Sequence, residues 1–277
     1  MLHWKLDASG VTTTPSIVNA LTQSYCVITS SADGSHWATE GIQGGISISD
    51  AQTGNLIRTL PSDISDVSPD ACTSLLSLTF TPDGKLLAAM GPDGLNPEGI
   101  GLKSTIDIWQ TDNGQNLLRL YPSFDPEQMN FNEDGSMLAI SSDDDYSRAE
   151  IWDVKSGKSL GIISPAGSCF AFGPDNTTIA TGQREGTFML ENLRSGSTIW
   201  RGKSQDLIDQ IIFSPNERLL AIATDSVVEL WDVQTGKRLN VLPSGGVSQL
   251  AFSPDGTNLA VGTFHGIIQL WSVPKTP

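Results

Sequence analysis

The sequence is poor in the residues that build catalytic and metal sites. Its 277 residues contain only three histidines and three cysteines, which are His3, His36, His265, Cys26, Cys72 and Cys169. The cysteines are odd in number, far apart and without metal-ligand spacing, which indicates reduced thiols. The sequence also has no G-x-S-x-G elbow, P-loop or supported His–Cys pair. It therefore predicts a protein that is not an enzyme and uses no metal or cofactor.

Long hydrophobic runs are absent as well. No stretch is long enough to span a membrane, and Met1–Asp7 lacks the apolar run of a secretory signal. The hydrophobic content of 38% is ordinary for a globular protein. We therefore expect a cytoplasmic location.

Basic residues are few, and the excess of acidic residues lies almost entirely in the first half of the chain. The chain has 16 Lys and Arg against 31 Asp and Glu, a formal net charge of -15. Residues 1–147 contain 5 basic and 19 acidic residues, whereas residues 148–277 contain 11 and 12. An acidic surface disfavours nucleic acid and anionic membranes and favours a partner with a basic surface. The alternative is that the acidic residues only keep the protein soluble.

What the sequence does contain is a repeated pattern of short strands. In its clearest copy, the apolar residues Ile211–Phe213 lead into a turn at Ser214–Glu217. Further strands are predicted at Leu219–Ala223, Val227–Val233 and Arg238–Leu242. Four short strands joined by tight turns predict one antiparallel sheet.

The pattern returns at spacings of roughly forty residues. Its first turn recurs at Phe80–Gly84, Phe131–Gly135, Phe172–Asn176 and Phe252–Gly256. Its third strand recurs at Ile106–Trp109, Ala149–Val154 and Ile268–Val273. A sixth, weaker copy has Ala32–Gly34 as its turn and Ile46–Asp50 as its third strand. Such a period in a strand-rich chain predicts a propeller or a solenoid.

The repeats resemble those of the WD-repeat β-propellers, in the short form common in bacterial members. The resemblance runs from about Tyr25 to the end of the chain and rests on FSPDG followed by LA, and on LWDV followed by TGK. It departs from the family in two respects. The Gly-His pair that precedes the first strand is missing, and the family's buried His-Ser/Thr-Asp-Trp network is therefore absent, with only Asp225 at the place of its Asp.

This resemblance implies an all-β propeller of four-stranded antiparallel blades, formed as a single domain over residues 1–277. Six repeats are visible, and the last one lacks a fourth strand. We expect residues 1–23 to supply that strand and close the ring, since closure removes exposed strand edges. A seven-bladed ring and an incomplete ring within a larger protein remain alternatives.

Stacked blades require both faces of each strand to be buried. We expect Leu219, Ala221 and Ala223 to line one face of their sheet, and Leu220 and Ile222 to line the other. The third strands should contribute buried tryptophans whose indole N–H groups have partners. These are Trp109, Trp152, Trp231 and Trp271.

Longer, acidic connections indicate a binding site. They lie at Pro61–Ser74, Gly91–Ser104, Phe124–Glu127 and Asp143–Tyr146, and the family's blade order places them on the same rim. Phe124 and Tyr146 are the expected apolar anchors. The candidate partner-binding residues are Asp66, Asp70, Asp93, Glu98, Phe124, Asp143, Asp144, Asp145 and Tyr146.

The sequence thus favours a non-catalytic interaction scaffold that binds a protein or a basic peptide, and neither nucleic acid nor membrane. Asp143–Asp145 lacks the alternating spacing of a calcium loop. Two alternatives are a propeller hydrolase or lyase with its site in the channel, and an architectural repeat domain of a larger signalling protein.

Overall fold

The structure, a computed structural model, describes most of the chain as β-strand. The described residues are 2–3, 16–17, 27–40, 45–61, 77–92, 104–142, 148–163, 169–183 and 185–273. They include no helix long and apolar enough to cross a membrane. The chain divides into two compact units, unit 1 (Met1–Asp125) and unit 2 (Pro126–Pro277).

Unit 1 contains two four-stranded antiparallel sheets and one short strand pair. The pair joins β1 (Leu2–His3) to β2 (Ser16–Ile17). The strands of the first sheet are β3 (Ile28–Ser30), β4 (His36–Glu40), β5 (Ile46–Asp50) and β6 (Leu56–Leu60). Those of the second sheet are β7 (Ser77–Phe80), β8 (Leu86–Pro92), β9 (Ser104–Gln110) and β10 (Asn116–Leu120).

Unit 2 continues the same arrangement with three four-stranded sheets and a last sheet of three described strands. The first sheet has β11 (Gln128–Phe131), β12 (Met137–Ser141), β13 (Ala149–Asp153) and β14 (Lys158–Ile163). The second has β15 (Cys169–Phe172), β16 (Thr178–Gly182), β17 (Thr187–Asn192) and β18 (Ser197–Lys203). The third has β19 (Ile208–Phe213), β20 (Leu219–Thr224), β21 (Val227–Asp232) and β22 (Arg238–Pro243). The fourth has β23 (Val247–Phe252), β24 (Asn258–Thr263) and β25 (Ile268–Ser272).

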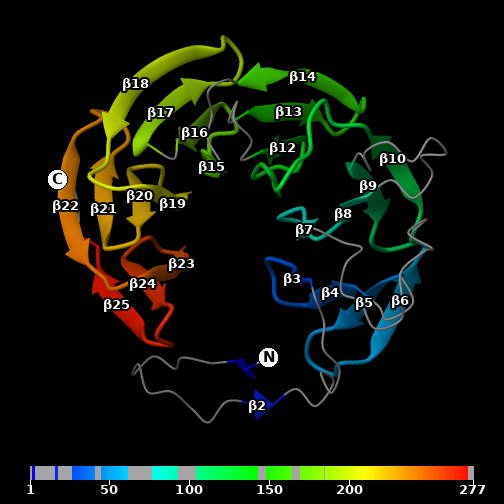
Figure 1. The fold of residues 1–277 in the computed structure, drawn as a ribbon. Helices are drawn as coiled ribbons and strands as arrows, with labels where there is room; N and C mark the ends of the chain where they lie inside the picture. The colour runs from blue at the N-terminus through cyan, green and yellow to red at the C-terminus, as the bar shows by residue number, and fades with distance from the viewer. Residues whose placement is uncertain are drawn as a thin grey trace. The chain divides into compact units, whose positions relative to one another are not determined.

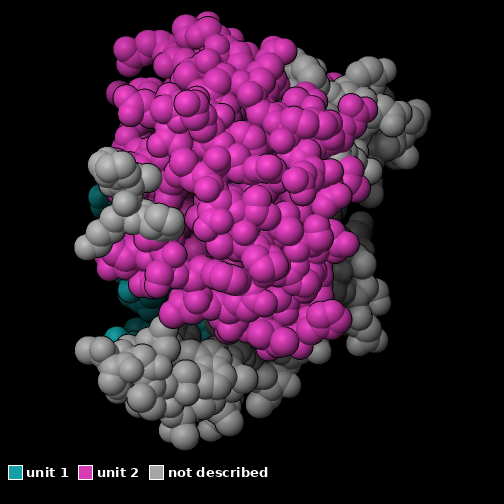
Figure 2. Space-filling view, turned by 90° about the vertical axis from the view of Figure 1, so that its left-hand side faces the viewer, with its two compact units in different colours: residues 1–125 teal, residues 126–277 magenta. Residues whose placement is uncertain are grey.

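In every sheet, the strands pair in the order in which they occur in the sequence. Within unit 2 the first strands β11, β15, β19 and β23 contact one another in succession, so consecutive sheets lie side by side (Figure 1). Figure 2 shows one face of unit 2 as a continuous packed surface. The predicted all-β fold of repeated antiparallel sheets is confirmed.

The turn between the first two strands has one hydrogen bond in common in all six described repeats, donated by a backbone N to the Oδ1 of the Asp or Asn two residues before it. In the last repeat, Asp255 Oδ1 accepts hydrogen bonds from Ser253 Oγ (2.6 Å), Thr257 N (3.0 Å) and Thr257 Oγ1 (2.8 Å). Gly256 follows with a φ of 68°, a left-handed conformation that glycine adopts at no steric cost. The Pro-Asp-Gly sequence therefore closes the hairpin as predicted.

Alternate residues of β20 face different neighbours. Leu220 and Ile222 belong to a buried cluster shared with the preceding sheet, which contributes Phe188. Ala221 and Ala223 belong to a second cluster, shared with β23 and β24. The predicted burial of both faces of this strand is thus confirmed for these four residues.

The tryptophans follow the prediction only in part. Trp109, Trp152 and Trp231 are buried, but Trp271 is only partly buried. Trp271 lies on β25, which pairs with β24 and with no other described strand. Trp231 Nε1 donates to Glu229 Oε2 (2.9 Å) and Trp271 Nε1 donates to Gln269 Oε1 (3.3 Å). For Trp109 and Trp152, the described residues supply no indole acceptor, so a partner for these two stays a prediction.

The predicted closure of a single ring by residues 1–23 falls mostly outside the described residues. In that segment only β1 and β2 are described, and they pair with each other. The single propeller domain and its closure therefore stay predictions.

Candidate functional site

Eight of the nine predicted partner-binding residues lie outside the described residues. They are Asp66, Asp70, Asp93, Glu98, Asp143, Asp144, Asp145 and Tyr146. The acidic rim that the sequence indicates therefore remains a prediction.

The ninth residue, Phe124, is described, and its ring is only 8% exposed. The role of Phe124 as an apolar anchor stays a prediction, although a side chain this buried offers a partner little surface. Its neighbour Asp125 accepts hydrogen bonds through Oδ1 from the backbone N (3.3 Å) and the Oγ (3.0 Å) of Ser104, the first residue of β9. In unit 1, Asp125 thus fixes this connection to the start of a strand.

A second set of acidic residues, which our sequence analysis missed, lies inside the sheets. The side chain of Glu229 on β21 is fully buried, and its two oxygens have different partners. Oε2 accepts the Trp231 indole N–H (2.9 Å), and Oε1 accepts Arg238 Nη1 (3.1 Å) from β22. Both buried oxygens are therefore satisfied within one sheet, as a buried charge requires.

The same position is acidic in two other sheets. On β9, Asp107 binds Arg119 through both oxygens, with Nε–Oδ1 and Nη2–Oδ2 distances of 2.9 Å. On β13, Glu150 Oε1 accepts the hydroxyl of Ser159 (2.6 Å). The signal was visible in the sequence, since each acid stands two residues before a tryptophan of a third strand. Because their partners lie on the adjacent fourth strand, these acids hold β9 to β10 and β13 to β14.

The described residues offer little else for chemistry. No group of three or more His, Cys, Asp or Glu side chains among them could hold a metal ion. Cys169 is buried and directs its thiol to the carbonyl oxygens of Gly182 (3.6 Å) and Ile208 (3.4 Å). This thiol is part of the packed interior.

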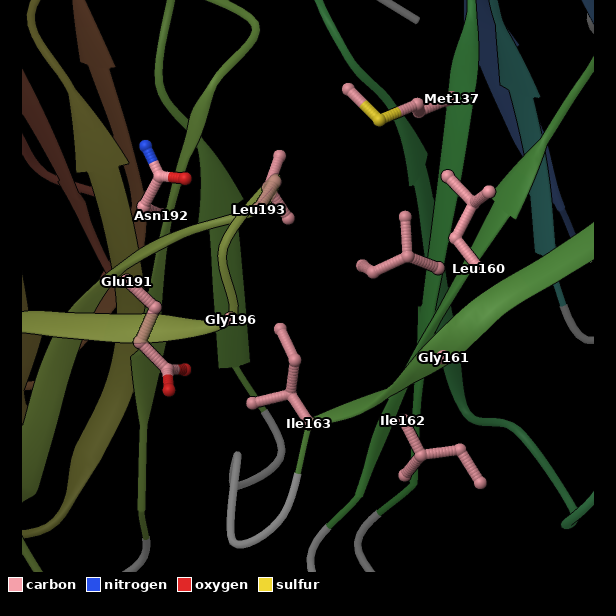
Figure 3. A pocket seen from close by; sticks show the side chains of 10 residues that line it. Met137, Leu160, Gly161, Ile162, Ile163, Glu191, Asn192, Leu193 and Gly196 are labelled. Atoms are coloured by element: carbon pink, nitrogen blue, oxygen red, sulfur yellow. The ribbon is translucent and has the colours of Figure 1, made fainter.

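The candidate binding site in the described part of the chain is a groove between the first two sheets of unit 2. It encloses about 280 Å³. Figure 3 shows β14 side chains on one side and residues of β17 and its following turn on the other. The groove is lined by Met137, Ile151, Leu160, Gly161, Ile162, Ile163, Glu191, Asn192, Leu193 and Gly196.

The base of the groove is part of the apolar core. Ile151 is buried, and Met137, Ile163 and Leu193 pack against the cluster to which it belongs. The outer wall is open, because Leu160 is 60% and Ile162 is 48% exposed on β14. The groove therefore has an apolar base and a solvent-exposed edge, and the polar residues Glu191 and Asn192 also line it.

One carboxylate, that of Glu191, faces this apolar surface. Its Oε2 atom is buried and has no hydrogen-bond partner among the described residues. Burial raises the pKa of the Glu191 carboxyl, and the positive charge of Arg201 partly opposes that effect. A carboxylate oxygen without a partner, next to apolar side chains, can bind a cationic group that carries its own hydrogen-bond donors.

The fold and these contacts define an all-β protein of repeated antiparallel sheets, in which neighbouring sheets of the same unit share a buried core. Comparison with known proteins shows a similarity to one family. Residues 236–272 match the family model "WD domain, G-beta repeat". The predicted resemblance to WD-repeat proteins is confirmed.

Curated relatives match a larger part of the chain. The small ribosomal subunit protein RACK1 of Schizosaccharomyces pombe is 29% identical over 119 residues, which are 39% of this chain and 38% of that protein. RACK1 of Caenorhabditis elegans is 31% identical over 112 residues, covering 36% and 34%. The guanine nucleotide-binding protein subunit beta of Schizosaccharomyces pombe is 32% identical over 96 residues, covering 33% and 32%. In each case the match spans only about a third of the relative's length.

Proposed function

We propose that this chain is a non-catalytic scaffold that binds a protein partner or a basic peptide through its acidic connections. The observation that carries the proposal is the distribution of charge. Residues 1–147 hold 19 acidic and 5 basic residues, and the longest connections between strands hold many of the acids. Connections supported by a rigid sheet framework are the usual place for binding, and clustered negative charge selects a positively charged partner.

Two further observations support a scaffold over an enzyme. Glu229, the most deeply buried acid that the structure describes, is hydrogen-bonded to structural partners, so it is not free to act as an acid or a base. The relatives are named as a ribosomal subunit protein and as a subunit of a guanine nucleotide-binding protein, which are both components of assemblies. We extend that role, and a cytoplasmic location, to this chain as part of the proposal.

The test is a triple variant with Asp143, Asp144 and Asp145 changed to lysine. Binding of a short fluorescent peptide rich in lysine and arginine is measured by anisotropy at several salt concentrations. We expect roughly tenfold weaker binding and a smaller salt dependence, since each exposed charge pair contributes about 0.2–1 kcal/mol.

The matched control changes the same charge elsewhere. Asp206, Asp209 and Asp225 are exposed in unit 2, and replacing them by lysine alters the net charge equally. If both triple variants lose binding to the same extent, only overall charge matters and the proposed rim site is wrong. If the Asp143–Asp145 variant binds as the native chain does, the site is also wrong.

A further inference from the structure

The groove in unit 2 arises from one exchange in the repeat. Glu191 and Asn192 of β17 occupy the places that Trp231 and Asp232 have on β21. The following turns confirm this alignment. Asn192 Oδ1 accepts a hydrogen bond from the backbone N of Ser195 (2.9 Å). Asp232 Oδ1 accepts the equivalent bond from the backbone N of Thr235 (2.6 Å).

In four of the other five repeats the residue at this place is a tryptophan, and in the first repeat it is Ser49. Three of these tryptophans show what the residue does where its packing is known. Trp231 packs in the cluster with Phe188 and Leu190 of the sheet before it, and Trp109 packs in the cluster of unit 1. Trp271 packs against the cluster that Ala221 and Ala223 share with its own sheet. Glu191 is smaller than an indole and points toward the sheet of β11–β14, so the space next to β14 stays open (Figure 3).

The size and chemistry of this space restrict what can occupy it. A volume of about 280 Å³ is at the lower limit for small-molecule pockets, so it suits one or two inserted side chains. The apolar wall formed by Leu160 and Ile163 suits an aliphatic chain. The buried Glu191 oxygen, which has no partner in the described part of the chain, suits a cation. An arginine meets both requirements, because its stem covers apolar surface and its guanidinium forms paired hydrogen bonds to a carboxylate.

We propose that this groove binds a peptide segment of a partner protein by taking in an arginine side chain, with an adjacent apolar residue resting on Leu160 and Ile162. The proposal deepens the proposed scaffold function and rests on it, but it uses a surface separate from the acidic connections. The apolar contacts give affinity, and Glu191 selects arginine over an uncharged side chain of similar length.

The probes are three fluorescent peptides with the central sequence Leu-X-Leu, where X is arginine, lysine or glutamine. We expect the arginine peptide to bind most tightly and the glutamine peptide roughly ten- to a hundredfold less tightly, because a hydrogen bond to a charged group contributes about 1.5–3 kcal/mol. Equal affinity for the arginine and glutamine peptides would overturn the role of Glu191.

Two substitutions at one position separate shape from charge. Glu191→Gln keeps the groove open, so it should bind the arginine and glutamine peptides alike. Glu191→Trp introduces the residue that four other repeats have here and fills the groove, so this variant should bind none of the peptides. Native-like binding by either variant overturns the proposal. If Glu191→Trp does not fold, Glu191→Gln and the apolar-wall variant Leu160→Asp still decide it.

The failure of this proposal can be told from that of the proposed function. The variant with lysine at Asp143–Asp145 leaves the groove intact and should keep its preference for arginine over glutamine. The opposite result has two parts: the rim variant loses the preference for the arginine peptide, and the Glu191→Gln variant binds both peptides as the native chain does. That result would assign binding to the rim and none to the groove.

Discussion

Replacing Gly202 by alanine tests the packing of unit 2 most directly. Gly202 on β18 lies opposite Phe188 on β17. A Cβ atom at Gly202 would be 2.1 Å from Phe188 Cζ and within 2.7 Å of both Cε atoms. Carbon atoms in good contact are about 3.5–4.0 Å apart, so the ring or the strand must move by more than an ångström.

The ring has little room to move. Phe188 is fully buried and makes edge contacts with Trp200 (ring centroids 5.8 Å apart) and Trp231 (4.9 Å). Overpacking of this kind costs about 1–3 kcal/mol, and we expect the upper end of that range. For a chain of this size, the melting temperature should fall by roughly 5 °C.

The assay is thermal unfolding followed by near-ultraviolet circular dichroism, which reports on the packing of the aromatic cluster. Gly245→Ala is the matched control, because nothing lies within 4 Å of its Cβ position. It should melt like the native chain or slightly higher. In the double variant Gly202→Ala, Phe188→Leu, the smaller side chain removes the clash, so the two costs should not add. A Gly202→Ala chain that melts with the Gly245→Ala chain would refute the reasoning.

Two further predictions concern the buried and the turn carboxylates. Glu229→Ala should lower the free energy of unfolding by about 2 kcal/mol, because the Trp231 indole loses its acceptor while Arg238 can still be hydrated. The measurement is urea unfolding, with the exposed residue Glu185 changed to alanine as the control. Equal midpoints for the two variants would contradict the role of Glu229. Hydrogen bonds from Ser253 and Thr257 lower the pKa of Asp255 to about 2, so its stabilising effect is present above its ordinary pKa of 3.8 and is lost as the pH falls toward 2. Asp255→Asn should therefore melt lower than the native chain near neutral pH and level with it near pH 2, and a difference that does not change with pH would contradict this assignment.

Much of the fold could be predicted because its signals are local. The Pro-Asp-Gly turn closes on itself, since Asp255 and its partners lie within a few residues of one another. The apolar run Leu219–Ala223 predicts a strand buried on both faces, because its consecutive residues point to opposite faces and all of them are apolar. The repetition of these signals every forty residues or so indicates the repeated sheets before any contact between sheets is known.

The features that the sequence did not reveal depend on contacts across strands and sheets. Phe124 was predicted to be an apolar anchor from its place in an acidic connection, but its burial depends on what packs around that connection and not on its composition. Trp271 was expected to be buried like the other third-strand tryptophans, but no described strand follows β25 in its sheet. The acids beside the tryptophans were overlooked, because their partners on the next strand are known only once the register is known.

The sequence by itself determined the strands, the turns and the repeat, because hairpins form between neighbouring residues and their chemistry is written in a few adjacent positions. Only the tertiary structure decided that Gly202 leaves room for Phe188 and that Glu191 borders an open groove next to β14. Both depend on how one strand or sheet lies against the next. That arrangement comes from side-chain packing between residues distant in the sequence, which no single segment encodes.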